Sequence, residues 1–396
     1  MQIGLSQNPK THVRLRRELR RVCSGFFVFY LLLVGYVLLT SAAEAASASP
    51  AVAKAKRDAE AKGYIFESSR DEIVAKAKKE GTLRGLASSS PETLAPLVKA
   101  FRQKYPFIDA RVNEITREDS QSRGIQLKTG SRFDEDVIHV PPDLYQDYLP
   151  HLKKFDLLGM AEQKVLDIPV KMIDPIHLNL VAMESSMQVV AFNKCLLDPA
   201  KVPNSWEDFL KPEFKGKKFL VDIRPNLQAV MAAGAGEEWM VNYSKKIAAQ
   251  QPIWIRGQTR TITQIASGEY TLHCGAYYQG VVRVMRKDPA GCLQLKIIEP
   301  IPIRVDGPHT VLATAANPHA ALLWLEFMAS PQGQAIIDEF EPVSASVFSP
   351  GSALEKIVRG KKVWIRDLPA IDKTSKWMAM AIEAFGFPRG KLPVTQ

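Results

Sequence analysis

The segment from His273 to Gly280, written HCGAYYQG, places two adjacent tyrosines, Tyr277 and Tyr278, directly after a predicted strand. A tyrosine hydroxyl donates and accepts hydrogen bonds, whereas the ring packs as an apolar surface. The pair could therefore face a polar ligand or belong to the core. The fold around the pair and the compartment of the protein decide between the two.

Three other predicted strands end in polar residues. Ser88-Ser89-Ser90 follows TLRGLA, Pro141-Pro142-Asp143 follows DEDVIHV, and Arg224-Pro225-Asn226 follows GKKFLVDI. In an open α/β sheet, ligands bind beyond the carboxyl ends of the strands. The serine run also begins a predicted helix, whose free N–H groups favour an anion. Each segment alone is an ordinary capped loop, but the four together indicate a site between two α/β units.

These segments predict a site for a small polar or anionic solute, because hydroxyls, a helix N-terminus and a guanidinium suit a carboxylate or phosphonate. Arg123 is a weaker candidate, since a solvated helix face also explains it. The residue pattern assigns no metal ligand, because the seven histidines are scattered without HExxH spacing and no CxxC occurs. The candidate ligand-binding residues are Ser88, Ser89, Ser90, Asp143, Arg224, Asn226, Tyr277 and Tyr278.

The motifs that would indicate an enzyme are absent. A serine at a strand-to-helix turn could mimic a nucleophile, but the sequence contains no G-x-S-x-G elbow. It also has no phosphate loop, dinucleotide fingerprint or paired catalytic carboxylates. His139 and His273 stand singly beside apolar strands, as core or edge histidines do. We therefore predict a protein that is not an enzyme and has no cofactor.

The N-terminus has the order of a secretory signal peptide. A basic region precedes the apolar run Gly25–Ala42, and the A-x-A patterns Ala43–Ala45 and Ala46–Ala48 follow it. An uncleaved anchor is the alternative, because the 18-residue run is near the lower limit for spanning a bilayer. We predict a signal peptide over residues 1–45, a mature chain that begins between residues 46 and 49, and a periplasmic or other extracytoplasmic location.

The charges and cysteines agree with an exported binding protein. The formal net charge is +10, and cleavage after Ala45 would remove six basic and two acidic residues and leave +6. Charges of both signs are interspersed without a basic stripe, so we expect no nucleic-acid partner. The mature chain would keep Cys195, Cys274 and Cys292, which allow one disulfide and one free thiol in an oxidising compartment. The sequence leaves the pairing open.

Strands and helices alternate after a linker and N-terminal helix at residues 46–80. Predicted strands at 82–87, 107–115 and 134–140 alternate with helices, which favours an α/β fold with a mostly parallel sheet. A second α/β unit follows. Its predicted strands are at 187–193, 216–223, 271–276 and 309–315.

Several stretches resemble the periplasmic solute-binding proteins of ABC importers, a family that includes ferric-ion binders. They are KAKKEGTLRGLASSSPETLAPLVKAFRQKYP, NKCLLDPAKVPNSWEDFLKPEFKGKKFLVDI, IASGEYTLHCGAYY and VLATAANPHAALLWLEFMASPQGQAII. The resemblance covers most of residues 70 to 350. It implies a monomer that captures a solute and delivers it to membrane-bound permease and ATPase subunits. A sensory solute-binding subunit is an alternative within the same family.

The resemblance also implies the type II periplasmic binding fold, with two α/β lobes joined by crossing strands around a cleft. Lobe one would comprise 81–187 plus 310–346, and lobe two 188–309 plus 347–396. The crossing segments would be Glu184–Asn193 and Val305–Val311, whose Ser-Ser-Met and Asp-Gly-Pro sequences could absorb a hinge rotation.

A ferric-ion cargo is the alternative to an organic solute. The ferric-ion binders of the family carry an adjacent tyrosine pair at the place matched by Tyr277-Tyr278, and phenolate oxygens suit a hard trivalent cation. Those binders usually add a histidine and a carboxylate from lobe one. Here the first loop has serines instead, and only Asp143 or Glu92 could supply the carboxylate. We therefore favour the organic solute.

Overall fold

The structure is a computed structural model that describes residues 49–142 and 144–387. The predicted signal peptide, its cleavage sites and Asp143 lie outside the described residues. The chain divides into an N-terminal unit that ends at Lys54 and a large unit from Ala55 onward. Helix α2 (Pro50–Ala61) crosses this boundary, and the following description concerns the large unit.

The first sheet region consists of three parallel strands, β1 (Thr82–Ala87), β2 (Asp109–Glu114) and β3 (Val137–His139). Its helices begin and end as local chemistry dictates. The Ser69 side chain caps α3, which Gly81 ends in the left-handed conformation, and a proline occupies the first position of α4. The helices of this region are α3 (Arg70–Glu80), α4 (Pro91–Lys104) and α5 (Arg117–Lys128).

The second sheet region contains β5 (Leu220–Asp222), β6 (Ile253–Ile255), β7 (Leu272–Tyr277) and β8 (Leu293–Lys296). Strand β5 lies between β6 and β7 and runs parallel to both. Helices connect these strands, so the predicted second α/β unit is present. They are α8 (Asn226–Ala235), α9 (Glu237–Ala249), α10 (Thr259–Ala266) and α11 (Tyr278–Met285).

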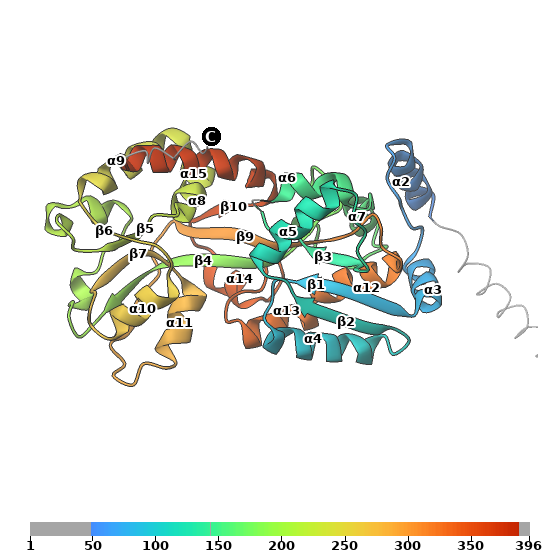
Figure 1. The fold of residues 1–396 in the computed structure, drawn as a ribbon, viewed down its shortest axis with the longest axis horizontal. Coiled ribbons are helices and arrows are strands. Elements are labelled where there is room, and N and C mark those ends of the chain that lie inside the picture. Colours follow the sequence, from blue (N-terminus) through green and yellow to red (C-terminus); the bar gives the residue numbers. More distant parts are fainter. Residues whose placement is uncertain (1–48, 143, 388–396) are drawn as a thin grey trace, which may run out of the picture. The chain divides into compact units, whose positions relative to one another are not determined.

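Two long antiparallel strands, β4 (Val181–Asn193) and β9 (Ile301–Val311), connect the regions (Figure 1). One end of β9 pairs with β3, whereas the far half of β4 pairs with β7 and β8. Strands β4 and β9 both begin earlier than the strands predicted there from the sequence, which were expected to start at residues 187 and 309. The prediction stopped at charged residues inside the strands, which are Glu184 in β4 and the ion pair of Arg304 and Asp306 in β9. The exact lobe boundaries stay a prediction.

The remaining elements complete both regions. Helix α12 (Pro318–Ala329) is buried from Ala320 to its end, and it contacts α3 through an ion pair between Arg70 and Glu326, 2.9 Å apart. Helix α15 packs on α9, where Lys376 binds Glu237. The other elements are α6 (Tyr145–Tyr148), α7 (Leu157–Glu162), α13 (Pro331–Phe340), α14 (Ala353–Val358), β10 (Val363–Arg366) and α15 (Ile371–Phe385).

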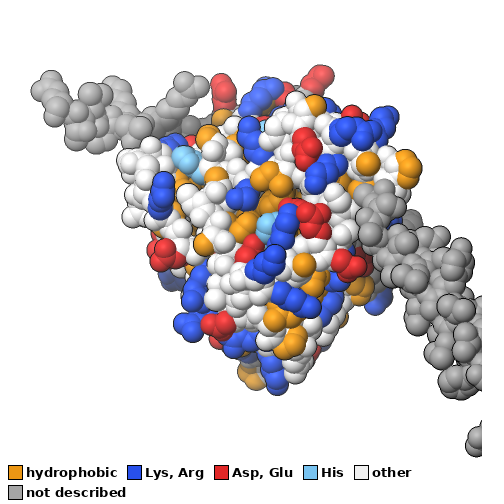
Figure 2. All heavy atoms as spheres, turned by 90° about the vertical axis from the view of Figure 1, so that its right-hand side faces the viewer, with side chains coloured by type: hydrophobic (Ala, Val, Ile, Leu, Met, Phe, Trp, Pro, Cys, Tyr) orange, Lys and Arg blue, Asp and Glu red, His pale blue; other side chains and the backbone are white. Residues whose placement is uncertain are grey.

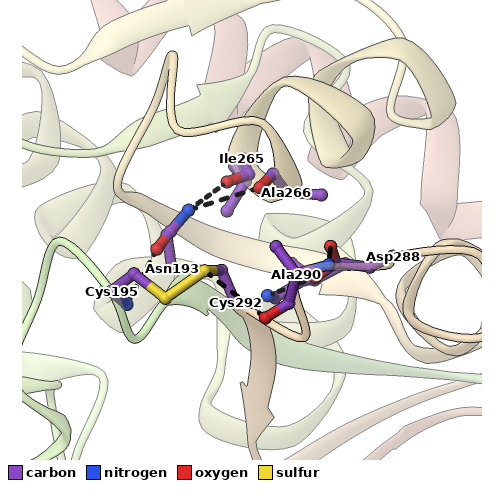
Figure 3. The surroundings of a disulfide bond; sticks show 8 residues. Asn193, Cys195, Ile265, Ala266, Asp288, Ala290 and Cys292 are labelled. Atoms are coloured by element: carbon purple, nitrogen blue, oxygen red, sulfur yellow. Dashed lines mark hydrogen bonds between the residues drawn. A yellow bond between two sulfur atoms is a disulfide. The ribbon is translucent and has the colours of Figure 1, made fainter.

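A disulfide joins Cys195, just after β4, to Cys292, just before β8, with Cα atoms 5.4 Å apart (Figure 3). The Asn193 amide holds the adjacent turn by donating to the Ile265 carbonyl at the end of α10. Cys274 is free and buried, and burial raises the pKa of its thiol to about 12. The structure thus settles the pairing that the sequence left open.

The described surface carries mixed charge. On the face shown in Figure 2, basic side chains are spread among acidic and apolar ones rather than gathered in a stripe. Within the described residues, no helix has the length and apolar character needed to cross a bilayer.

Candidate functional site

A cavity of about 270 Å³ lies where the crossing strands meet both sheet regions. Its floor comes from residues 184–186 of β4 and from Arg304 of β9. Tyr277 at the end of β7 and Arg283 of α11 line it from the second region. Glu341, just after α13, lines it from the first region. Polar groups from both regions therefore face one space.

Arg304 is the centre of the basic side of this pocket. Its Nε donates to Asp306 Oδ2 at 2.6 Å, and its Nη1 donates to the Tyr277 hydroxyl at 2.9 Å and to Asn226 Oδ1 at 3.3 Å. The guanidinium also lies 5.1 Å from the centre of the Tyr277 ring, within cation–π range. Burial lowers the pKa of the Arg304 guanidinium. The nearby groups of Asp306 and Tyr277 outweigh burial, so the pKa is raised overall. The guanidinium is therefore charged and held rigidly.

Glu184 is the centre of the acidic side. Its Oε1 accepts hydrogen bonds from the Ser89 hydroxyl at 2.8 Å and the Ser88 hydroxyl at 3.4 Å. Burial, and after it the nearby carboxylate of Glu341, raises the pKa of Glu184 to about 7. The hydrogen bond from Ser89 opposes this shift. Glu184 is thus poised to gain or lose a proton near neutrality.

The structure brings several predicted residues to this pocket through partners that were not predicted. Ser88 and Ser89 reach it by contacting Glu184, and Asn226 and Tyr277 by contacting Arg304. The Ser90 amide donates to Glu341 at 3.2 Å. These contacts come from loops after β1, β5 and β7, the strand ends to which the sequence pointed.

Arg224 and Tyr278 are placed differently. Arg224 forms a two-point ion pair with Asp222, and its side chain is 46% exposed. The ring of Tyr278, the first residue of α11, packs partly buried against the hydrophobic core, whereas Tyr277 lines the pocket. The tyrosine pair is therefore divided between the two roles considered for it. Arg123 binds Glu135 at 2.9 Å, away from the pocket lining.

Sequence reasoning missed Glu184, Arg304 and Glu341. A signal existed for the first two, because Glu184 and Arg304 are charged residues inside otherwise apolar strands. A charge at such a position costs free energy unless it has a partner or a function. Glu341 has no comparable signal, because it follows an amphipathic helix on which an exposed glutamate is ordinary.

The sequence profile of the family described as bacterial extracellular solute-binding protein matches residues 145–365, more than half of the chain. The chain belongs to this family. The family consists of binding proteins, so the prediction that this solute-binding protein is not an enzyme is confirmed. His139 and His273, described above as core or edge histidines, are buried, and burial lowers the pKa of both. No curated protein matches the solute-binding protein in sequence.

Solved structures confirm the fold. The solute-binding protein is similar to Trichodesmium IdiA (FutA) in complex with iron and citrate, with a TM-score of 0.59 and 20% identity over 77% of this chain and 98% of that one. It is similar to the ferric iron-binding protein A of Mannheimia haemolytica in an open conformation, with a TM-score of 0.60 and 16% identity over 77% and 98%.

A third similar structure is the substrate-binding protein of the ABC transporter from Agrobacterium tumefaciens, with a TM-score of 0.57 and 16% identity over 77% of this chain and 94% of that one. At such identities the likeness shows the fold alone. The fold is the two-lobed type II periplasmic binding fold, as predicted.

Proposed function

We propose that this solute-binding protein is exported, captures a small solute with an anionic group in the pocket around Arg304, and delivers it to the permease of an ABC importer. ATP would be hydrolysed by the ATPase subunits of that importer. The observation that carries the proposal is a rigid, charged guanidinium beside a tyrosine hydroxyl in a cavity between the two sheet regions.

The pocket's size and lining favour an organic anion. Its 270 Å³ would hold roughly nine waters, which is the scale of a metabolite of few heavy atoms. Arg304 and Tyr277 can both donate hydrogen bonds to a carboxylate or phosphonate, and charged hydrogen bonds of this kind are the strong ones. Arg283, exposed on α11, adds positive charge on the same side.

Capture would involve closure of the two lobes. The pocket lining comes from both sheet regions and from the strands that join them. A solute that contacts both sides binds the closed form more tightly than the open form, so it shifts the population toward closure. A permease that recognises the closed form would then receive only loaded protein.

A ferric-ion cargo is the second candidate, because two of the similar structures are described as binding iron and because Tyr277 lines the pocket. Three observations favour the organic anion. Tyr278 packs against the core, and the Tyr277 hydroxyl faces a guanidinium, which repels a cation. The pocket lining, as far as the structure describes it, also contains no histidine, the ligand that the ferric-ion binders usually add from lobe one.

The experiment that tests the proposal is native mass spectrometry of the protein purified from the periplasm, followed by calorimetry with the solute that co-purifies. We expect a small organic anion. Arg304→Gln should weaken its binding by about 10- to 150-fold, because a buried anionic group would lose charged hydrogen bonds. The matched control Arg111→Gln, at an arginine 64% exposed on β2, should leave binding unchanged.

Other outcomes point to the alternatives. An iron ion in the spectrum, with a visible phenolate-to-iron absorption band that Tyr277→Phe removes, would replace the organic solute by iron. Co-purification with a histidine kinase and not with a permease would indicate the sensory role.

A further inference from the structure

The pocket presents opposite charges on its two sides. Glu184 and Glu341 line it and bind the serines after β1, whereas Arg304 binds Asn226 and Tyr277 of the second region, and Arg283 lines it from α11. Two carboxylates alone would be an ordinary acidic patch. Here they share one cavity with two guanidiniums, and Glu184 is not neutralised by an ion pair to either. A purely anionic solute would use only half of this lining.

The carboxylate of Glu184 has unused capacity to accept hydrogen bonds. Its Oε1 accepts from Ser88 and Ser89. Within the described part of the chain, Oε2 has no hydrogen-bond partner and is not sealed from solvent. Oε2 is therefore free to accept a hydrogen bond from a charged donor of the solute, and hydrogen bonds between charged groups are the strong ones.

Strand register sets the spacing of the two residues along the sheet. In the antiparallel pair of β4 and β9, Glu184 lies opposite Asp306, and Ser186 lies opposite Arg304. The two charged residues that line the pocket therefore belong to successive cross-strand pairs on the same face of the sheet. That spacing is about 7 Å along the strands, the scale of a short molecule with a charge at each end.

We infer that the solute is a zwitterion, with an ammonium group bound by Glu184 and an acidic group bound by Arg304. The inference deepens the proposed function and rests on it. Ser88 and Ser89 hold the carboxylate of Glu184 in place, and Asp306 and Asn226 hold the guanidinium of Arg304. Both recognition groups are thus preorganised, which lowers the cost of binding.

Binding of such a solute depends on the charge of Glu184. The charged groups that act on Glu184 are Glu341 after α13 and Asp306 on β9, and Arg304 and Arg283 line the same pocket. With its pKa raised to about 7, Glu184 is mostly protonated at pH 6 and mostly ionised at pH 8. Affinity for an ammonium group should therefore rise by about tenfold over this interval, in which simple amino acids do not change charge.

The test compares matched pairs of probes by calorimetry at pH 8: 3-aminopropanoate with propanoate, 4-aminobutanoate with butanoate, and 5-aminopentanoate with pentanoate. For at least one pair, we expect the amino acid to bind tenfold or more tightly than its deaminated partner. Glu184→Gln should remove this preference and flatten the pH dependence between 6 and 8. The control Glu213→Gln, at an exposed glutamate outside the pocket, should change neither.

The outcomes separate the two proposals. Equal binding of both members of each pair, or an equal loss of both in Glu184→Gln, would overturn the zwitterion inference while anion capture stands. Absence of binding by every probe, with a co-purified solute that lacks an acidic group, would overturn both. Should Glu184→Gln fold poorly, Ser89→Ala leaves the carboxylate in place and should weaken only the amino acids.

Discussion

At the scale of single residues, the site is organised by side chains on the crossing strands rather than by the loops. Arg304 gathers Tyr277, Asn226 and Asp306, and Glu184 gathers the serines after β1. Arg366, buried on β10, adds a second guanidinium beside Asp306 at 3.4 Å, and burial lowers the pKa of Arg366 to about 10. Because Arg304 and Glu184 are each held by several partners, the loop residues act mainly by positioning these two side chains.

The different positions of the two tyrosines give a residue-scale prediction. Tyr277→Phe should weaken binding of the co-purified solute by about 5- to 150-fold, because the solute loses a hydroxyl and Arg304 loses a partner. Tyr278→Phe should leave affinity within about twofold, because its ring packs against the core and keeps its bulk. Calorimetry on both variants checks this. Equal losses in the two variants would show that both hydroxyls reach the solute.

At the scale of elements, a bulge in β7 aims the tyrosine at the pocket. The register of β7 against β4 shifts between Val189 and Ala191, and Gly275 has φ of +87°. A Cβ at Gly275 would lie 2.7 Å from Leu227 Cδ2. A side chain here would adopt a strained positive φ and displace the Leu227 side chain, so glycine is favoured.

Gly275→Ala should consequently destabilise the protein by about 1–3 kcal/mol and also weaken solute binding. Chemical unfolding and calorimetry measure the two effects. Gly280→Ala is the control for stability alone, because Gly280 lies in α11 and lines the pocket, a Cβ there would meet no atom within 4 Å, and alanine favours a helix. Unaltered binding in Gly275→Ala would show that the bulge does not position Tyr277.

His319 links α12 to the segment around α3. Its Nε2 lies 2.8 Å from Glu67 and its Nδ1 2.6 Å from Glu80. Burial opposes the charged form, but these two hydrogen bonds outweigh it and raise the pKa of His319 to about 9. For Glu67 burial is likewise outweighed by hydrogen bonds, from His319 and Lys76, and its pKa falls to about 2. The cluster is thus ionised at neutral pH.

The sign of the pH effect follows from the direction of the shift. Because the folded-state pKa of His319 lies above its ordinary value of 6.5, its contribution is complete below pH 6.5 and is lost as the pH rises through 9. His319→Gln should cost about 1–3 kcal/mol at pH 6 and little at pH 10. Urea unfolding across this range checks it, with His151→Gln as the control. A cost independent of pH would show that only packing is lost.

At the scale of the whole molecule, the continuous strands β4 and β9 join the two sheet regions, because β9 pairs with β3, β4 pairs with β7 and β8, and the two strands pair with each other. Gly307 lies within β9 at φ of +62°, next to Pro308. Rotation of one region against the other would have to pass through these strands. In the proposed function, these strands would link solute binding to lobe motion, because both contribute residues to the pocket lining.

Solution scattering tests this link. Saturating solute should reduce the radius of gyration of the wild type, because closure expels water from the pocket and brings the lobes together. Arg304→Gln at the same solute concentration should stay at the larger radius. An unchanged radius in a protein that calorimetry shows to be saturated would count against closure.

Much of the fold was predictable because it depends on local patterns. Apolar periodicity, the Ser69 cap and the proline at the start of α4 gave the α/β succession of the first region. Turn residues after β1, β5 and β7 pointed to the edge where the pocket lies. The predicted start of β4 was wrong, because a glutamate and two serines inside a strand resemble a loop until their partners are known.

By itself, the sequence determined the class of fold, the family and the strand ends that face the site, since these follow from short-range patterns and motifs. Only the tertiary structure decided that Glu184 and Arg304 line one pocket, that Tyr277 faces this pocket while Tyr278 packs inward, and that Cys195 pairs with Cys292. Each of these depends on residues tens of positions apart being brought together. Such contacts arise from strand register and packing, which no local pattern encodes.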